Sequence, residues 1–499
     1  MNYLERKIFR SEMIDCSLCY DAPCSKACLH HLDPAKLLRN VWFDNENAAA
    51  AKLPDGPLAC MGCRAKCELA CNQYVHIPIV LGRLYGLKEN GSAIKPDESL
   101  LKTEFCGFPL ENPFLLSSSV VSSTYEKMAR AFEAGWAGAA TKTVTTMDIH
   151  EASPRYSATW DAAGEIQGFK NIEQLSQLSV EENADIIRRL KKDYPTKYML
   201  VSIMGKDDAE WAWLAKEMQK AGADALELNF SCPNMVEEGT GSAIGQQPEV
   251  VKHLTKVVKD AVTIPVIAKL TPNVASMSEA AEAAVEGGAD GIAAINTLKS
   301  LIPVADTKVA VGGLSGKAVF PIALRFISEL GLDHRLSDTY ISAMGGVETW
   351  RDAAEFIGYG ANTVQVTTAV MEYGIDIISD LKEGLAVFLA ANNTSLEEIT
   401  GRALSQVVDT EDMERDVVVY PKFDRDLCTG CGRCFVSCRD GGHEAIRFDE
   451  EKRIPVMDGK KCVGCHLCVI VCPECAITSS GVTVKKAGRS ENEKYGEQQ

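Results

Sequence analysis

Short apolar runs, often β-branched, recur through the middle of the chain, and amphipathic stretches separate most of them. The runs predict eight strands, at 113–116, 138–141, 199–203, 225–228, 266–270, 291–295, 339–343 and 363–366. The amphipathic stretches predict helices, for example at 124–134, 209–221, 248–260 and 277–286. Eight strands with intervening helices over roughly 300 residues favour an α/β fold of the (β/α)8 TIM barrel type at 100–410. A doubly wound open sheet is the competing assignment.

Polar residues follow these predicted strands directly. They are Ser117 and Ser118, Lys142, Asn229 with Ser231 and Cys232, Lys269, Asn296 and Thr297, Gly345 and Gly346, and Thr367 and Thr368. Because active sites of such barrels lie at the carboxyl ends of the strands, we expect these side chains to surround one site.

The nineteen cysteines are concentrated at the two ends of the chain. Residues 1–95 carry eight and residues 415–480 carry nine, whereas the long middle region carries only Cys106 and Cys232. A secreted disulfide framework would distribute its cysteines through a short chain. The distribution instead predicts metal sites in a reducing compartment. Cys106 and Cys475 receive no role.

The C-terminal cysteines form two C-x2-C-x2-C-x3-C quartets, and a proline follows the second. The quartets are Cys428, Cys431, Cys434 and Cys438, then Cys462, Cys465, Cys468 and Cys472. This pattern is typical of bacterial two-cluster ferredoxins, in which the fourth cysteine usually ligates the other cluster. We therefore predict a domain with two [4Fe–4S] clusters at 415–480, with structural zinc as the alternative.

The N-terminal cysteines have less regular spacing. They are Cys16, Cys19, Cys24 and Cys28, then Cys60, Cys63, Cys67 and Cys71. Zinc is a more serious alternative here, but eight thiolates beside a ferredoxin module favour two further [4Fe–4S] clusters in an α-helical domain at 1–95.

Composition and charge limit the remaining function classes. A chain of 499 residues suits two or three domains. The net charge of −17, from 52 basic and 69 acidic residues, argues against a nucleic-acid-binding surface. Residues 1–15 lack the pattern of a signal peptide, and no apolar run reaches the ~18 residues of a membrane span. We expect a cytoplasmic protein with a polar tail at 485–499.

Three segments together resemble one known family. CSLCYDAPCSKAC at 16–28 is similar to the N-terminal cluster domain of dihydropyrimidine dehydrogenases. AGWAGAATKT at 134–143, GADALELNFSCP at 222–233 and AKLTPN at 268–273 resemble the FMN domain of that family. The ferredoxin module completes a three-part order that is more specific than any single motif.

The resemblance implies a ligand set for each N-terminal cluster. Cys16, Cys19, Cys24 and Cys71 would hold one cluster, and Cys28, Cys63 and Cys67 three corners of the other. A glutamine fills the last corner in animal members, but none stands near residue 85 here. We predict that Cys60 replaces it.

The resemblance also implies the residues of the barrel site. Around FMN it places Ser117, Lys142, Thr143, Lys269, Gly313, Met344, Gly345, Gly346, Thr367 and Thr368. Around a pyrimidine it places Asn171, Asn229, Ser231, Asn296 and Thr297. Cys232 matches the catalytic acid, and a thiol with an ordinary pKa near ~8.5 can exchange a proton around neutrality. The loop at 234–245 could act as a lid.

The implied activity is interconversion of uracil or thymine with the 5,6-dihydropyrimidine. No strand is followed by G-x-G-x-x-G, so we expect electrons from an FAD/NAD(P)-binding partner subunit or a ferredoxin, within an oligomer. Two alternatives remain. A related barrel oxidoreductase could act on dihydroorotate or another cyclic enone or amide, or the chain could be an electron-relay subunit without catalysis of its own.

Overall fold

The computed structural model describes residues 12–485, apart from 14, 57–58, 162–163, 236–239 and 306–307. The chain divides into two compact units, one that ends at Val407 and one that begins at Val408. Of the predicted polar tail at 485–499, only Lys485 lies among the described residues. None of the helices in the described part of the chain has the length and hydropathy that a membrane span needs.

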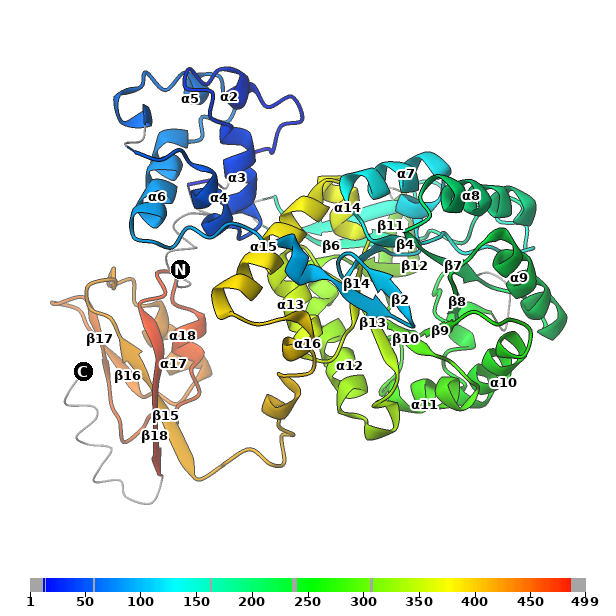
Figure 1. Ribbon diagram of the computed structural model, residues 1–499. Coiled ribbons are helices and arrows are strands. Elements are labelled where there is room, and N and C mark those ends of the chain that lie inside the picture. The colour runs from blue at the N-terminus through cyan, green and yellow to red at the C-terminus, as the bar shows by residue number, and fades with distance from the viewer. Residues whose placement is uncertain are drawn as a thin grey trace. The chain divides into compact units, whose positions relative to one another are not determined.

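Eight parallel strands close into a barrel in the first unit, which confirms the predicted TIM-barrel fold (Figure 1). In chain order the strands are β3 (Phe114–Leu116), β4 (Gly138–Ala140), β7 (Tyr198–Ile203), β8 (Ala225–Asn229), β9 (Val266–Lys269), β10 (Gly291–Ala294), β13 (Tyr340–Met344) and β14 (Thr363–Val366). Each coincides with one of the predicted apolar runs. All residues of these eight strands are buried except Tyr340, the first residue of β13, as expected for parallel strands covered by helices.

Helices surround the barrel strands. They are α7 (Tyr125–Ala134), α8 (Val180–Asp193), α9 (Asp208–Ala221), α10 (Pro248–Lys259), α11 (Ser278–Glu286), α12 (Phe320–Leu332), α13 (Trp350–Gly358), α14 (Thr368–Tyr373), α15 (Ile377–Asn392) and α16 (Leu396–Ile399). Local sequence fixes several ends. Ser179 and Glu182 form a capping box at the start of α8, and Gly222 ends α9 in the left-handed conformation.

Two groups of short strands were absent from the sequence prediction. The hairpin β1 (Thr103–Phe105) and β2 (Phe108–Leu110) places Phe105 against Tyr198 at the amino-terminal end of the barrel. A four-stranded sheet has the order β11-β12-β6-β5. Its strands are β5 (Tyr156–Trp160), β6 (Ile166–Asn171), β11 (Leu298–Ala305) and β12 (Lys308–Ser315).

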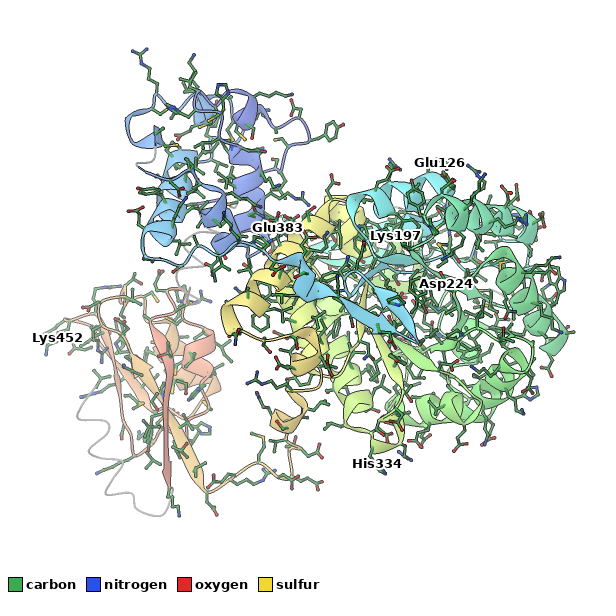
Figure 2. All side chains as sticks on the ribbon, in the orientation of Figure 1. Glu126, Lys197, Asp224, His334, Glu383 and Lys452 are labelled. Atoms are coloured by element: carbon green, nitrogen blue, oxygen red, sulfur yellow. The ribbon has the colours of Figure 1, made fainter. Side chains whose placement is uncertain are left out.

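The N-terminal part of the first unit is helical, as predicted. Its helices are α2 (Pro23–Lys26), α3 (Pro34–Trp42), α4 (Glu46–Lys52), α5 (Lys66–Leu69) and α6 (Ile77–Glu89). It contacts α15 through ion pairs. Arg39 Nε lies 2.7 Å from Asp380 Oδ2, and Lys52 Nζ lies 2.5 Å from Glu383 Oε2, a residue labelled in Figure 2.

Gly384 on α15 is part of this contact. A Cβ added there would overlap the Trp350 ring and Asn45 Oδ1. We expect Gly384→Ala to lower the free energy of unfolding of this unit by about 1–3 kcal/mol, the usual cost of overpacking. Urea unfolding followed by tryptophan fluorescence measures it.

Gly86→Ala on α6 is the matched control, since a Cβ at Gly86 meets no atom within 4 Å. Alanine in a helix interior should be neutral or stabilise by roughly 0.5–1 kcal/mol. Equal stability of the two variants would contradict the packing described for Gly384.

The second unit has the strand–helix arrangement of a small ferredoxin-like domain. Its elements are β15 (Val417–Phe423), α17 (Arg433–Gly441), β16 (Ile446–Asp449), β17 (Ile454–Met457), α18 (Leu467–Ile470) and β18 (Ile477–Lys485). β15 pairs with β18 and β16 with β17, both antiparallel.

Candidate active site and cluster sites

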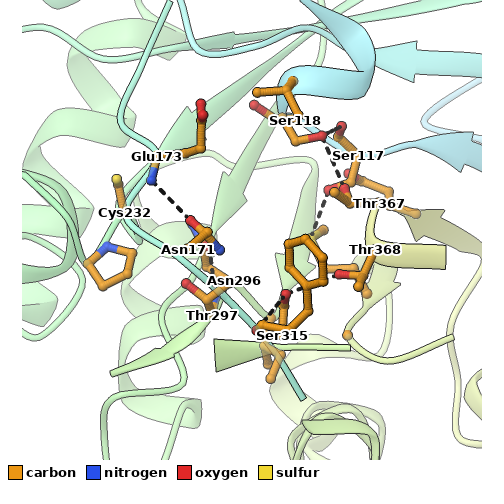
Figure 3. A pocket seen from close by; sticks show the side chains of 18 of the residues that line it. Ser117, Ser118, Asn171, Glu173, Cys232, Asn296, Thr297, Ser315, Thr367 and Thr368 are labelled. Carbon is orange, nitrogen blue, oxygen red and sulfur yellow. Dashed lines mark hydrogen bonds between the residues drawn. The ribbon is translucent and has the colours of Figure 1, made fainter. Parts of the chain in front are cut away.

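The carboxyl ends of the barrel strands surround a cavity (Figure 3). Fourteen predicted site residues line it, namely Ser117, Lys142, Thr143, Asn171, Asn229, Cys232, Lys269, Asn296, Thr297, Met344, Gly345, Gly346, Thr367 and Thr368. The structure thus brings together residues from eight separated parts of the chain.

One end of the cavity is rich in hydroxyl groups. Figure 3 shows Ser117, Ser118, Thr367 and Thr368 gathered there, away from Cys232. Gly345 and Gly346 reach this end with φ of 124° and 80°, which brings their backbone to the cavity wall without a side chain. Small hydroxyl side chains and exposed backbone are what a phosphate group requires, so this end fits the phosphate of a flavin mononucleotide.

Lys269 and Gln365 form part of the cavity floor. Lys269 is 3% exposed, and its Nζ lies 3.2 Å from Glu227 Oε1. Gln365 Nε2 donates to Glu227 Oε2 at 3.2 Å, whereas its buried Oε1 has no partner among the described residues. An unpaired acceptor beside a buried cation suits a ring that presents both N–H and C=O groups, as a flavin does.

A chain of hydrogen bonds holds the predicted substrate residues in place. Asn229 Nδ2 donates to Thr143 Oγ1 at 2.9 Å, and Asn229 Oδ1 accepts from both the N–H and the hydroxyl of Ser231. Asn296 Nδ2 donates to Ser231 Oγ at 2.9 Å, and Asn296 Oδ1 accepts from Thr297 N. Each amide keeps a second N–H that none of these bonds uses, so both asparagines can donate to a ligand carbonyl.

Two predicted site residues, Ser231 and Gly313, do not line the cavity. Ser231 is fully buried and links Asn229 to Asn296. Gly313 lies on β12, where an added Cβ would overlap the Thr297 side chain. Both residues thus contact side chains that line the cavity, Ser231 through hydrogen bonds to Asn229 and Asn296 and Gly313 through its close approach to Thr297.

Cys232 lies at the other end of the cavity, next to the predicted lid. Ser242 N donates to the Cys232 carbonyl at 2.9 Å, and Gly241, with φ of 59°, lets this segment approach closely. Burial raises the pKa of the Cys232 thiol to about 11, although a backbone N–H from Asn234 opposes the shift. The thiol is therefore protonated over a wider pH range than its ordinary pKa suggests. Residues 236–239 of the lid lie outside the described residues.

A group of charged side chains near Cys232 was not predicted. Lys142 Nζ lies 2.6 Å from Glu173 Oε2 and 3.4 Å from Glu151 Oε1. Burial opposes ionisation of Glu173, but hydrogen bonds from Lys142, Arg155 and Tyr156 hold its pKa below the ordinary value. Glu173 lines the cavity as a carboxylate, so the positive charge of Lys142 is compensated before any ligand binds.

The ferredoxin-like unit contains two cavities, each surrounded by four cysteines. One is lined by Cys428, Cys431, Cys434 and Cys472. The other is lined by Cys438, Cys462, Cys465 and Cys468. The fourth cysteine of each quartet thus joins the other quartet, which is the exchange typical of two-cluster ferredoxins.

The N-terminal thiols also exchange between quartets. Burial, with the neighbouring Cys16 and Cys71 thiols, raises the pKa of Cys24 to about 11. Burial raises the pKa of Cys60 to about 11 as well, and Cys28, Cys67 and Cys63 add to that shift. Among the described residues, no group of three or more Cys, His, Asp or Glu side chains is arranged to ligate a single metal ion. The thiols of Cys16 and Cys71 thus lie near Cys24, and those of Cys28, Cys63 and Cys67 lie near Cys60.

Family comparisons agree with this organisation. A family described as dihydroorotate dehydrogenase matches residues 100–389, and one described as a 4Fe-4S dicluster domain matches residues 422–478. The first implies a flavin site and the second implies [4Fe–4S] clusters. A solved dihydroorotate dehydrogenase from Eimeria tenella, in complex with ferulenol, superposes with a TM-score of 0.53 at 18% identity. It covers 65% of this chain and 94% of its own, which supports the barrel fold alone.

The chain is also similar to dihydropyrimidine dehydrogenases and to a dihydroorotate dehydrogenase. The NAD-dependent dihydropyrimidine dehydrogenase subunit PreA of Escherichia coli K12 is 46% identical over 397 residues, 77% of this chain and 97% of that relative. The chloroplastic dihydropyrimidine dehydrogenase (NADP(+)) of Arabidopsis thaliana is 35% identical, over 64% of this chain and 80% of the relative. The dihydroorotate dehydrogenase B (NAD(+)) catalytic subunit of Pyrococcus abyssi is 37% identical, over 61% and 99%. This chain is an oxidoreductase that belongs to the dihydropyrimidine dehydrogenase family, with a dihydroorotate dehydrogenase-type barrel and a 4Fe-4S dicluster domain.

Proposed function

We propose that this chain interconverts uracil or thymine with the corresponding 5,6-dihydropyrimidine. The observation that carries the proposal is that a protonated thiol, Cys232, and an ordered row of amides line one cavity at the carboxyl ends of the barrel strands. Uracil presents alternating carbonyl acceptors and N–H donors. Asn229 and Asn296 can donate to its carbonyls, and the Glu173 carboxylate can accept from an N–H.

Reduction of the C5=C6 bond adds a hydride equivalent to C6 and a proton to C5. Bound FMN would supply the hydride chemistry. The Cys232 thiol would give the proton, and the resulting thiolate would recover one from solvent. Ser117, Thr367 and Thr368 with Gly345 and Gly346 would hold the phosphate end, and Lys269 with Gln365 would face the ring.

The charges around Cys232 favour a neutral pyrimidine over dihydroorotate. Dihydroorotate carries a carboxylate at C6, which needs an unpaired cation in the site. Lys142 is already paired with Glu173 and Glu151, and Arg155 Nη1 lies 3.0 Å from Glu173 Oε1. A ligand carboxylate would therefore meet cations that are already paired, together with the carboxylates that pair with them.

We propose four [4Fe–4S] clusters as the electron path, two at each end of the chain. The thiol groups around Cys24, Cys60, Cys434 and Cys468 support this count. Electrons would come from an FAD/NAD(P)-binding partner subunit or from a ferredoxin, and an oligomeric assembly is part of the proposal.

The test is reduction of uracil and of orotate by the FMN-loaded chain with reduced methyl viologen as the donor. We expect turnover with uracil or thymine and little with orotate. Glu173→Gln should raise the rate ratio of orotate to uracil at least tenfold, since about 1.4 kcal/mol of lost repulsion gives that factor. Two like charges a few ångströms apart in a site of this kind repel each other by roughly that much or more.

Glu126→Gln is the matched control, because Glu126 lies exposed on α7, outside the cavity (Figure 2). It removes the same charge and should leave the ratio unchanged. Wild-type preference for orotate would overturn the substrate proposal. Failure to bind FMN or turn over either substrate would favour the electron-relay alternative.

A further inference from the structure

The interior of this barrel contains a group of polar side chains at positions where such barrels usually carry branched aliphatic side chains. Glu227 on β8, Lys269 on β9, Ser342 on β13, and Thr363 and Gln365 on β14 are all buried there. Thr363 Oγ1 donates to Ser342 Oγ at 2.8 Å, and Gln365 Nε2 donates to the same oxygen at 3.0 Å. The group therefore forms one connected network.

Glu227 is the acidic member of this network and does not line the cavity. Its side chain is 0% exposed, and its two oxygens contact different partners. Oε1 lies 3.2 Å from Lys269 Nζ, and Oε2 accepts from Gln365 Nε2 at 3.2 Å. Lys269 and Gln365, by contrast, both line the cavity. Glu227 can therefore influence a bound ring only through these two side chains.

We propose that Glu227 is a positioning residue that orients Lys269 and partly neutralises its charge, and thereby holds down the reduction potential of the bound flavin. The inference rests on the FMN-binding part of the proposed function and not on the identity of the substrate. Two-electron reduction leaves negative charge on the flavin ring, and a bare buried cation would stabilise that charge strongly. A carboxylate behind the cation weakens the stabilisation.

A lower potential has a direct use in this chain. A flavin that is too easily reduced retains its electrons instead of passing them to an electron-poor C=C bond. Glu227 would keep the flavin able to deliver electrons, while Lys269 still provides a cation for binding. The fixed pair also keeps Lys269 extended toward the cavity, because a buried lysine without a counter-charge would be costly.

The experiment is spectroelectrochemical titration of the FMN midpoint potential in the full chain carrying Glu227→Gln. Loss of the carboxylate should favour reduced FMN at least tenfold at a fixed ambient potential, a positive shift of about 30 mV or more for a two-electron couple. Glu227→Asp keeps the charge, so its FMN midpoint potential should lie between those of Glu227→Gln and the wild type. It also provides a result if Glu227→Gln does not fold.

The second step tests whether Glu227 acts through Lys269. On a Lys269→Met background, Glu227→Gln should produce less than half of the shift it causes in the wild type, as a double-mutant cycle would show. A full-size shift on that background, or an unchanged or lower potential in Glu227→Gln alone, would overturn the proposal.

Asp224→Asn is the matched control for removal of an acidic partner. Asp224, which is labelled in Figure 2, directly precedes β8, and its Oδ2 lies 2.8 Å from Nζ of Lys191, a residue that does not line the cavity. The same charge change there should leave the flavin potential unchanged. A shift in this control as large as that of Glu227→Gln would also overturn the proposal, since net charge alone would explain both.

Discussion

Replacement of Cys232 with alanine is expected to lower the turnover of uracil by about 10²–10⁴-fold, the usual contribution of a general acid. Cys232 is the only cysteine among the described residues that line the barrel cavity, so no second thiol can replace it. FMN should remain bound, because the hydroxyl-rich end and the Lys269 floor lie elsewhere in the cavity. Steady-state rates and the FMN content of the purified variant measure both effects.

The pH dependence should follow the raised pKa of Cys232. Reduction of the pyrimidine needs the protonated thiol, so its rate should hold at neutral pH and fall as pH approaches about 11. Oxidation of the dihydropyrimidine needs the thiolate, so its rate should rise with pH over the same range. Cys232→Ser should weaken both dependences, because a hydroxyl does not titrate there.

Cys106→Ala is the control for the thiol itself. Cys106 lies beside Asp290 at the amino-terminal end of the barrel, and its Sγ is 4.0 Å from the Asp290 carbonyl. This variant should keep its activity and pH profile. Full activity in Cys232→Ala would remove Cys232 from the proposed chemistry.

Removal of a single ligand from the ferredoxin-like unit is the second large effect we expect. Cys434→Ala removes one of the four thiols of its cluster cavity, which Cys428, Cys431 and Cys472 also line. One cubane should be lost, which lowers the content from about sixteen to about twelve iron atoms per chain. Turnover should be abolished with a donor whose electrons reach the flavin through the clusters. A dihydropyrimidine should still reduce the bound flavin.

Cys475→Ala is the matched control, since Cys475 belongs to the same unit but lines neither cluster cavity. It should retain all of the iron. Metal analysis of the wild type also separates the two interpretations of the N-terminal quartets. About eight iron and two zinc atoms per chain would contradict the four-cluster proposal, which predicts about sixteen iron atoms and no zinc.

The barrel could be predicted from sequence because its signals are local. Runs such as 113–116 and 291–295 are short, apolar and fully buried on both faces, so burial and pattern agree. The strand-end residues Asn229, Lys269 and Asn296 followed from the same pattern, since parallel strands bring their carboxyl ends to one side.

The sheet of β5, β6, β11 and β12 was missed because its strands depend on tertiary pairing. Gly312 and Gly313 interrupt the β12 pattern, yet both are needed where an added Cβ would overlap neighbouring side chains. A signal was available, however. Residues 142–178 and 296–319 contain no predicted element, and connections of that length are uncommon in compact domains.

Glu173, Glu227 and Gln365 were missed for a related reason. Glu173 follows β6 of the unpredicted sheet, so its place in the cavity could not be anticipated. Glu227 and Gln365 lie inside predicted strands, where polar residues are usually assigned to an exposed face. Only the closed barrel shows that they share an interior with Lys269.

The most direct test of the central claim is an anaerobic titration of the oxidised, FMN-loaded chain with dihydrouracil and with dihydroorotate. Absorbance of the flavin and the clusters is followed without any added donor or partner. The proposed function predicts that dihydrouracil bleaches both the flavin and the clusters, and that dihydroorotate bleaches neither. Bleaching by dihydroorotate with no response to dihydrouracil would contradict it.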